Sequence, residues 1–313
     1  MKILGISAGT RNGSNDCMCK EALMGAKEQG AEVEFINLFD LNIHHCTGCV
    51  ACVNAVFSTG RKVCSLKDDF AWLLEKMLDA DGILFTVPIF EKGAPGIFHT
   101  IMDRFGPSTD RGILTVATEI AQKTGSTPPD ARWLQDKVVS YIGIGGSDWH
   151  SRVQCDCAMQ AMSPAWKVID NEVFQWSLGI LEDDAKAARA HTIGVNLAKA
   201  AADAAHAEYQ GEAGVCPHCH SREFFFDIDG AVECCLCGIR GEMVIDGGKY
   251  AFRFPDSELA HAHDTLSGKF KHADDIQRNN GHANEFRKTE EYKTKLQKYK
   301  DFIQGSKPPK AEA

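Results

Sequence analysis

Two pairs of closely spaced cysteines give the clearest sign of chemistry in this sequence. Cys216 and Cys219 form one C-x2-C pair, and Cys234 and Cys237 form a second. The stretch between the pairs contains two strand-like runs around an Asp-Gly turn, which indicates a hairpin. Four thiolates presented in this way can surround one tetrahedral metal ion. The pattern therefore predicts a small metal-binding domain.

Two ions suit such a site. Iron bound as in rubredoxin also uses two such cysteine pairs and would be redox-active. The second pair is followed by Gly238, as that alternative requires, whereas the first is followed by His220 instead of glycine. The hairpin between the pairs favours zinc, which would fold a segment too small to be stable alone. Cys235 is predicted to be a bystander, and His218 and His220 are predicted to face solvent.

A second group of cysteines lies near the N-terminus. Cys46, Cys49 and Cys52 follow one another with two intervening residues, and Cys64 comes eleven residues after the last of them. Thiolates at this spacing in a loop can each bind a different iron of one [4Fe-4S] cluster. The alternative is that the same cysteines are reduced side chains that pack the loop. The spacing leaves both possibilities open.

The order of apolar runs indicates how these groups are positioned. Strand candidates alternate with helical stretches over roughly the first 200 residues, a pattern typical of a doubly wound parallel sheet. Five strands at this spacing suit a flavodoxin-like α/β fold. Segment 105–136, which contains Pro128-Pro129, is predicted to be an irregular insertion whose Trp133 shapes a substrate pocket. The strand candidates are residues 2–7, 31–38, 81–88, 137–146 and 167–176.

Three loops would lie at the carboxyl edge of this sheet, where ligands bind in such folds. The loop from Ser7 to Asn15 is rich in hydroxyls, amides and glycine and leads into a helix, which predicts a phosphate site. Arg11 adds a positive charge there. The loop 86–96 can place the Phe90 ring against a flat heterocycle. A third loop, which begins Gly145-Gly146-Ser147, offers backbone amides.

Four features give the sequence a family resemblance. They are the S-x3-R-N-G-S-N loop that starts at Ser7, the C-x-G-C-x2-C segment, the Pro88-Ile89-Phe90 turn and the Met102-Asp103-Arg104 motif. In these features the chain resembles the NADPH-dependent FMN reductases and iron–sulfur flavoproteins of the flavodoxin-like superfamily, over residues 1–205.

The resemblance implies an FMN site on the three loops. It assigns the FMN phosphate to Ser7, Arg11, Asn12, Gly13, Ser14 and Asn15, and the isoalloxazine ring to Pro88, Ile89, Phe90 and Gly93. Thr10 belongs to the link Ala8-Gly9-Thr10, which is longer than usual in the family, and is a further candidate. Gly145, Gly146 and Ser147 complete the predicted FMN-binding set.

Composition narrows the class of protein. The chain has 313 residues, a formal net charge of −9 and thirteen cysteines. This charge disfavours nucleic acid or an anionic membrane as a partner. The N-terminus shows no signal-peptide pattern, and no apolar run approaches the ~20 residues of a membrane span. We therefore expect a cytoplasmic protein whose cysteines serve metal, cluster or thiol chemistry instead of disulfides.

The sequence thus predicts three regions and one leading function. The regions are a flavodoxin-like FMN domain (1–210), a zinc-ribbon-like domain (211–256) and a helical, partly disordered tail (257–313). The leading function is FMN-dependent reduction of a small molecule such as a quinone, aromatic or flavin. Electrons would come from NAD(P)H or a ferredoxin-like donor, and flavin N5 would be the reactive group, without a catalytic side chain.

An electron carrier that passes electrons between protein partners through a [4Fe-4S] cluster and the flavin is the alternative function. In either case we expect a homo-dimer or tetramer by analogy with related reductases.

Overall fold

The computed structural model describes residues 1–49, 51–52, 55–56, 64–106 and 109–307. The chain divides into two compact units, Met1–Lys269 and Phe270–Ala313. The first unit holds a parallel sheet and a smaller antiparallel sheet, and the second is helical.

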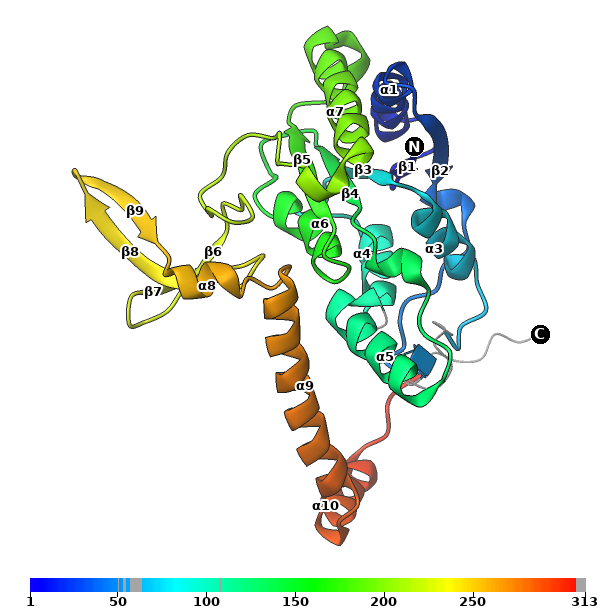
Figure 1. Cartoon of the computed structure of the whole chain (residues 1–313), viewed down its shortest axis with the longest axis vertical. Coiled ribbons are helices and arrows are strands. Elements are labelled where there is room, and N and C mark those ends of the chain that lie inside the picture. The colour runs from blue at the N-terminus through cyan, green and yellow to red at the C-terminus, as the bar shows by residue number, and fades with distance from the viewer. Residues whose placement is uncertain (50, 53–54, 57–63, 107–108, 308–313) are drawn as a thin grey trace. The chain divides into compact units, whose positions relative to one another are not determined.

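A five-stranded parallel sheet forms the centre of the first unit (Figure 1). The strand order is β2-β1-β3-β4-β5, and every neighbouring pair is parallel. This order confirms the predicted flavodoxin-like fold. Each strand falls within or coincides with its predicted range. The strands are β1 (Lys2–Ser7), β2 (Glu32–Asn37), β3 (Gly82–Pro88), β4 (Val138–Ile144) and β5 (Lys167–Phe174).

Helices cover both faces of the sheet, so the core has two parts. Residues of α1 and α7 pack with one face, on side chains that include Ile3 and Ile142. Residues of α3, α4, α5 and α6 pack with the other, on side chains that include Ile6 and Tyr141. The helices are α1 (Ser14–Glu28), α3 (Phe70–Asp79), α4 (Gly96–Phe105), α5 (Arg111–Thr124), α6 (Val153–Met162) and α7 (Asp184–Ala202).

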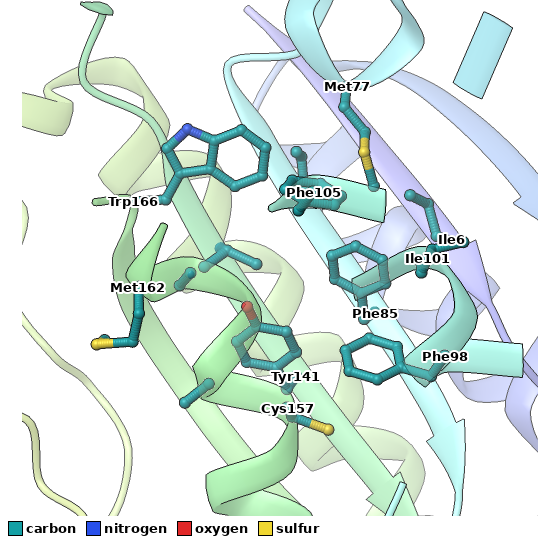
Figure 2. Close-up of a cluster of buried hydrophobic side chains, with 14 of the residues drawn as sticks. Ile6, Met77, Phe85, Phe98, Ile101, Phe105, Tyr141, Cys157, Met162 and Trp166 are labelled. Atoms are coloured by element: carbon teal, nitrogen blue, oxygen red, sulfur yellow. The ribbon is translucent and has the colours of Figure 1, made fainter. Parts of the chain in front are cut away.

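Aromatic rings fill much of the second part of the core (Figure 2). Phe85 stacks on Tyr141 with ring centroids 5.7 Å apart, and Phe98 meets Phe85 edge-on at 5.4 Å. Trp133 stacks on Trp166 at 6.4 Å and is buried. The prediction that Trp133 shapes a substrate pocket was therefore wrong, because its ring belongs to the core.

The predicted irregular insertion 105–136 contains a helix. The Asp110 side chain accepts hydrogen bonds from the amides of Gly112 and Ile113, which caps the start of α5. Gly125, in the left-handed conformation, ends the helix. Between these signals Leu114, Ala117 and Ala121 recur at helical spacing and are buried. The prediction of an irregular segment overlooked this pattern of caps and apolar residues.

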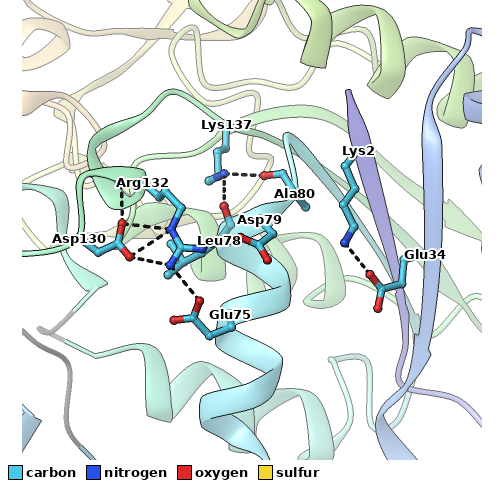
Figure 3. A network of polar contacts seen from close by, with 9 residues as sticks. All are labelled: Lys2, Glu34, Glu75, Leu78, Asp79, Ala80, Asp130, Arg132 and Lys137. Atoms are coloured by element: carbon cyan, nitrogen blue, oxygen red, sulfur yellow. Dashed lines mark hydrogen bonds and ion pairs between the residues drawn. The ribbon is translucent and has the colours of Figure 1, made fainter.

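Charged side chains fasten the amino-terminal end of the sheet to neighbouring helices (Figure 3). Lys137 is buried and donates to the carbonyl oxygens of Leu78 and Ala80, which close α3. Burial lowers the pKa of Lys137. Arg132 bridges Asp130 and Glu75. These contacts hold the end of the sheet opposite to the three predicted ligand-binding loops.

The second sheet of the first unit has four antiparallel strands in the order β6-β7-β8-β9. Its chain entry is tied to β5, because the Gln210 amide donates to the Ile169 carbonyl at 2.7 Å. Its exit is tied to α5 by a buried ion pair of 2.7 Å between Lys269 and Asp110. The strands are β6 (Phe224–Phe226), β7 (Ala231–Cys234), β8 (Arg240–Asp246) and β9 (Lys249–Arg253).

The C-terminal residues are helical, as predicted. A short helix, α8 (Asp256–Ala260), precedes α9 (Leu266–Arg287) and α10 (Glu290–Phe302). The Thr289 side chain caps α10. The predicted disorder of the end of the chain concerns residues 305–313, of which 308–313 lie outside the described residues. In the described part of the chain, none of the helices combines the length and apolarity that crossing a membrane requires.

Candidate functional site

The loop from Ser7 to Asn15 joins β1 to the start of α1 at the carboxyl edge of the parallel sheet. Its backbone approaches the next strand, since the Ala8 amide donates to the Thr86 carbonyl at 2.8 Å. A Cβ atom on Gly9 would lie 2.5 Å from the Asn15 Cβ, so only glycine fits there. Gly13 precedes α1 without a side-chain cap. The amides at this helix start are therefore open to an anion.

Two buried polar residues outside the predicted set hold this loop. Asn37, at the end of β2, donates to the Gly9 carbonyl at 3.0 Å and to the Asp16 carboxylate at 2.8 Å. The other Asp16 oxygen accepts the Asn12 amide at 2.7 Å. Asn12 has a φ of 57°, which this hydrogen bond helps to hold. The loop is thus fixed in one shape by side chains of β2 and α1.

Arg11 has partners in the protein. Its guanidinium donates to the Asp40 carboxylate and to the Phe39 carbonyl, both in the turn after β2. Arg11 and Asp40 are both more than half exposed. In this structure Arg11 therefore anchors the phosphate loop to the neighbouring turn, and the loop amides are the better candidates for direct phosphate contacts.

The second loop follows β3. Phe90 and Gly93 exchange hydrogen bonds of 3.0 and 2.9 Å, which form a tight turn, and Glu91 and Lys92 within it have positive φ angles. Asp156 of α6 accepts the Ala94 amide at 3.0 Å and lies so close to Gly93 that a Cβ atom there would be 2.3 Å away. The loop is therefore shaped by α6 as well as by its own sequence.

The third loop follows β4. Hydrogen bonds join its start to the segments that end β3 and β5. The Ile89 amide donates to the Ile144 carbonyl, and the Gly145 amide donates to the Phe174 carbonyl. A Cβ atom on Gly145 would lie 3.1 Å from Ile89, so glycine allows the two loops to pack closely. Ser147 accepts the Trp149 amide at 3.2 Å. The structure thus brings the three predicted loops together at one edge.

Large apolar side chains on the segments that follow β3, β4 and β5 face solvent. We call them the rim patch. Phe90 is 63% exposed, Trp149 59% and Trp176 67%. Single exposed apolar residues are ordinary, but a group at one edge indicates a binding surface. The rim patch consists of Phe90, Trp149, Trp176, Leu178 and Leu181.

FMN fits this edge on features of the structure alone. The Asn15 side-chain amide is buried and has no hydrogen-bond partner among the described residues, so it can donate to a ligand. Gly9 and Gly13 allow the compact shape of the loop, because an added Cβ would lie 2.5 Å from the Asn15 Cβ or 2.9 Å from the Thr10 carbonyl oxygen. The rim patch supplies flat apolar surface beside the loop. A phosphate and an aromatic heterocycle, joined by a polar chain, match these three features.

The predicted iron–sulfur cysteines take separate positions. Cys46 and Cys49 are exposed, whereas Cys52 and Cys64 are half-buried. Across the described residues, these thiols do not form a group of three or more at metal-binding distance. The Cys49 sulfur lies 3.3 Å from the Ser65 hydroxyl. Hydrogen bonds from Ser65 and nearby groups lower the pKa of Cys49 to about 7.

A buried ion pair holds the segment that carries these cysteines. Arg104 of α4 donates to both carboxylate oxygens of Asp68, to the His44 carbonyl and to the Cys64 sulfur. Its guanidinium also lies over the Phe70 ring. Burial opposes ionisation of Asp68, but the hydrogen bonds from Arg104 and the backbone outweigh it and lower the pKa to about 2. The Met102-Asp103-Arg104 motif thus serves to position the cysteine loop.

The C-terminal cysteines form the metal-type group that the sequence predicts. The sulfur atoms of Cys216, Cys219, Cys234 and Cys237 all lie within 4.8 Å of one another. The Cys216–Cys237 and Cys219–Cys234 sulfurs are 3.7 and 3.5 Å apart. Zinc–sulfur bonds of ~2.3 Å require sulfur separations of about 3.8 Å in a tetrahedron. The four thiols are therefore already placed for one tetrahedral ion.

Cys235 and two histidines lie next to this group in the sequence. The Cys235 side chain is exposed and stays outside the four-sulfur group, as predicted. The prediction that His218 and His220 face solvent was wrong. His218 is paired with Asp264 at 2.6 Å, and His220 stacks on Tyr209. Both residues follow or lie within the first cysteine pair, so they connect the metal-type group to the rest of the first unit.

Comparisons with known proteins show which proteins this chain is similar to. Residues 1–180 match the family described as NADPH-dependent FMN reductase. A solved structure titled flavone reductase is 58% identical, covers 98% of this chain and 100% of its own, and superposes with a TM-score of 0.89. Flavone synthase cfoJ of Aspergillus candidus is 26% identical over 298 residues, 88% of this chain and 89% of that protein.

A third relative is an iron–sulfur flavoprotein. An iron–sulfur flavoprotein of Archaeoglobus fulgidus is 29% identical over 208 residues, 64% of this chain and 92% of that protein. Fold and site together define a flavodoxin-like FMN oxidoreductase. The chain belongs to the NADPH-dependent FMN reductase family.

Proposed function

We propose that this protein reduces a carbon–carbon double bond conjugated to a carbonyl in a planar polyphenol of the flavone type. The observation that carries the proposal is the rim patch, whose aromatic rings surround the edge where the flavin would bind. The names of two relatives that span nearly the whole chain support it, since both refer to flavones. A flat, largely apolar substrate suits exposed Trp and Phe rings.

The FMN contacts that we propose follow from the three loops. The phosphate would be held by the backbone amides of Thr10, Arg11, Ser14 and Asn15 and by the side chains of Ser7, Ser14 and Asn15. The ring would lie between Pro88, Ile89, Phe90 and Gly93 on one side and Gly145, Gly146 and Ser147 on the other. Arg11 would act through the loop that it anchors.

When bound, FMN supplies the hydride that the substrate carbon accepts, at the expense of NAD(P)H or a ferredoxin-like donor. The protein's part is to bind and orient the substrate. Trp149 and Phe90 would contact the planar substrate and so limit its orientation at this edge. The proton that balances the added hydride would come from water at this edge.

We further infer that Cys216, Cys219, Cys234 and Cys237 bind structural zinc. Their sulfur separations suit a closed tetrahedral site, and the surrounding sheet has little core of its own. Rubredoxin-type iron is the alternative, and metal content distinguishes the two ions.

An electron carrier is the second candidate function. The C-x-G-C-x2-C segment and the iron–sulfur relatives favour it. It requires that Cys46, Cys49, Cys52 and Cys64 close around a [4Fe-4S] cluster. About four irons per chain after purification without oxygen would support this function. Zinc and FMN without iron would leave hydride transfer as the working mechanism.

Turnover of a flavone tests the leading proposal. FMN-loaded protein with NADH or NADPH, without oxygen, should convert a flavone to the flavanone, identified by mass spectrometry. Trp149→Ala should raise the KM about tenfold through loss of aromatic contact area. The control is Trp72→Ala, a similarly exposed tryptophan of α3, which should leave the KM unchanged. Reduction of a quinone but not of any flavone would overturn the proposed substrate class.

A further inference from the structure

Trp176, just beyond the end of β5, has a backbone conformation that is unfavourable for a tryptophan. Its φ is 53°, in the left-handed region that suits glycine. A bulky residue stays in this region only where the surrounding structure imposes it, and such residues concentrate at ligand-binding sites. Packing gives little in return, because the side chain is 67% exposed. Neither backbone preference nor burial therefore accounts for a tryptophan at this position.

Both neighbours of Trp176 are held by hydrogen bonds. The amide of buried Ser177 donates to the Gly145 carbonyl at 2.9 Å, and the Ser177 hydroxyl donates to the Gln175 carbonyl at 2.9 Å. The same Gln175 carbonyl accepts a hydrogen bond of 2.7 Å from Lys186 of α7. These bonds impose the turn at Trp176. They also tie it to the third loop of the proposed flavin site, which contains Gly145.

The Trp176 side chain borders an open hollow of about 560 Å³, which Gly179 and Ile180 also line. This volume is within the range of small-molecule sites, about 300–1,000 Å³. The hollow adjoins the proposed flavin edge, because the residue after Trp176 is bonded to Gly145. A planar compound bound at the flavin edge can therefore extend to the Trp176 ring.

Carboxylates dominate the charged side chains of this hollow. Glu182, Asp183 and Asp184 line it together with one cation, Lys186. Lys186 is paired with Asp183 at 3.2 Å. Within the part of the chain that the structure describes, Glu182 and Asp184 form no ion pair. The hollow therefore repels anionic groups, and its carboxylates can accept hydrogen bonds from hydroxyl groups.

We propose that Trp176 is a specificity-determining residue, which binds the outer ring of the substrate in this hollow and selects a ring with a free hydroxyl group. The indole supplies flat contact area. Glu182 and Asp184 accept the hydrogen bond of the phenol, which its methyl ether cannot donate and which an anionic sulfate ester would replace with repulsion. This inference rests on the proposed function and narrows its substrate class to flavones with an unmodified phenol ring.

Equilibrium dialysis with oxidised, FMN-loaded full-length protein is the first test. The probes are a flavone with one hydroxyl on its outer ring and the methyl ether of the same compound. The wild type should bind the hydroxyl compound about tenfold more tightly. Glu182→Gln combined with Asp184→Asn should reduce this preference to less than threefold. Trp176→Leu should weaken binding of both probes about tenfold, whereas the control Trp72→Leu should change neither.

Dialysis requires no turnover, so the result is separate from that of the proposed reaction. Flavones that bind with this preference but are not reduced would refute the proposed function and support the subsite. Equal affinity of the wild type for the phenol and its ether would overturn the proposed selection. Unchanged binding by Trp176→Leu would overturn the role of the tryptophan.

A pair of smaller substitutions is the second test, because it separates the ring from the backbone. Trp176→Gly and Trp176→Ala both remove the ring and should weaken binding of the hydroxyl compound equally, by about tenfold. Glycine fits a φ of 53° and alanine does not, so Trp176→Gly should have the higher urea midpoint of the two. A wild type with a higher midpoint than Trp176→Gly would show that the tryptophan stabilises the fold, and would overturn the inference.

Discussion

The His220 ring stacks on Tyr209, with ring centroids 4.3 Å apart and planes 12° from parallel. His220 directly follows Cys219, and Tyr209 precedes Gln210, whose amide is bonded to β5. The pair therefore links the four-cysteine group to the parallel sheet. Both rings line two cavities of about 270 and 420 Å³.

The backbone of His220 has a left-handed conformation, which makes the linking role of this pair testable by substitution. His220 has a φ of 61°, and Gly238, at the equivalent place in the second cysteine pair, has a φ of 73°. A left-handed conformation is unfavourable for a residue with a side chain. His220→Gly should therefore retain the metal, with up to about 1 kcal/mol gained locally. It should also release the linker, so that a glutamate-specific protease cleaves after Glu208 or Glu212 faster. Tyr209→Leu should give the same cleavage. If either variant keeps its metal but is cleaved no faster than the wild type, the linking role is contradicted.

Removal of the metal should unfold the ribbon alone. The four cysteines hold a sheet whose apolar face is half exposed, whereas the parallel sheet has its own two-part core. Cys216→Ser should abolish metal binding and make residues 211–256 exchange amide hydrogens rapidly, while the strands of the parallel sheet stay protected. Cys235→Ser is the control and should behave like the wild type. Loss of protection in β1 and β3 would show that the parallel sheet also depends on the ribbon.

The phosphate loop should tolerate no side chain at Gly9. Because an added Cβ would meet Asn15 at 2.5 Å, Gly9→Ala should weaken FMN retention by at least about tenfold. The fold should persist, because the strain is local to the loop. Gly96→Ala is a suitable control, since nothing lies within 4 Å of its added Cβ. FMN fluorescence in the filtrate after ultrafiltration measures retention. Equal retention in the two variants would place the phosphate elsewhere.

The buried Asp68–Arg104 pair predicts an acid-dependent stability. The folded pKa of Asp68 is about 2, below its usual value, so its contribution to stability is present above pH 4 and is lost as the pH falls towards 2. This contribution is about 2 kcal/mol at neutral pH.

Asp68→Asn tests this contribution. It should lower the free energy of unfolding by roughly 3 kcal/mol, because Arg104 would stay buried without its counter-charge. The variant should also lose the slope between pH 4 and pH 2. Urea unfolding at several pH values measures both effects, and exposed Asp69→Asn serves as control. A retained slope in Asp68→Asn would assign the acid dependence to other carboxylates.

Sequence reasoning found the sheet and the loops because they depend on local patterns. Continuous apolar runs such as 82–88 identify buried parallel strands, and glycine- and amide-rich turns follow them. Asn37 and Thr86 were missed, although each is a buried polar residue at the carboxyl end of its strand. Their role depends on β1 lying between β2 and β3, which is a property of the strand order and not of either segment.

The same distinction applies to the cysteines. The C-terminal pairs are bridged by a short hairpin, so local structure alone brings their sulfurs together. Cys64 is separated from Cys52 by a longer segment, and its position depends on Arg104 of a different helix. The rim patch also escaped prediction, because single exposed apolar residues are unremarkable in a sequence and only their grouping in space gives them meaning.

Reoxidation of the reduced protein by a flavone tests the central claim most directly. FMN-loaded protein reduced without oxygen to its end point and mixed with a flavone should regain the oxidised flavin spectrum, with one flavanone formed per flavin. This stoichiometry would show that the reduced flavin itself passes its hydride to the flavone, independently of the physiological donor. A flavin that stays reduced in the presence of flavone, yet is reoxidised by a protein electron acceptor, would contradict the claim and make electron carriage the function.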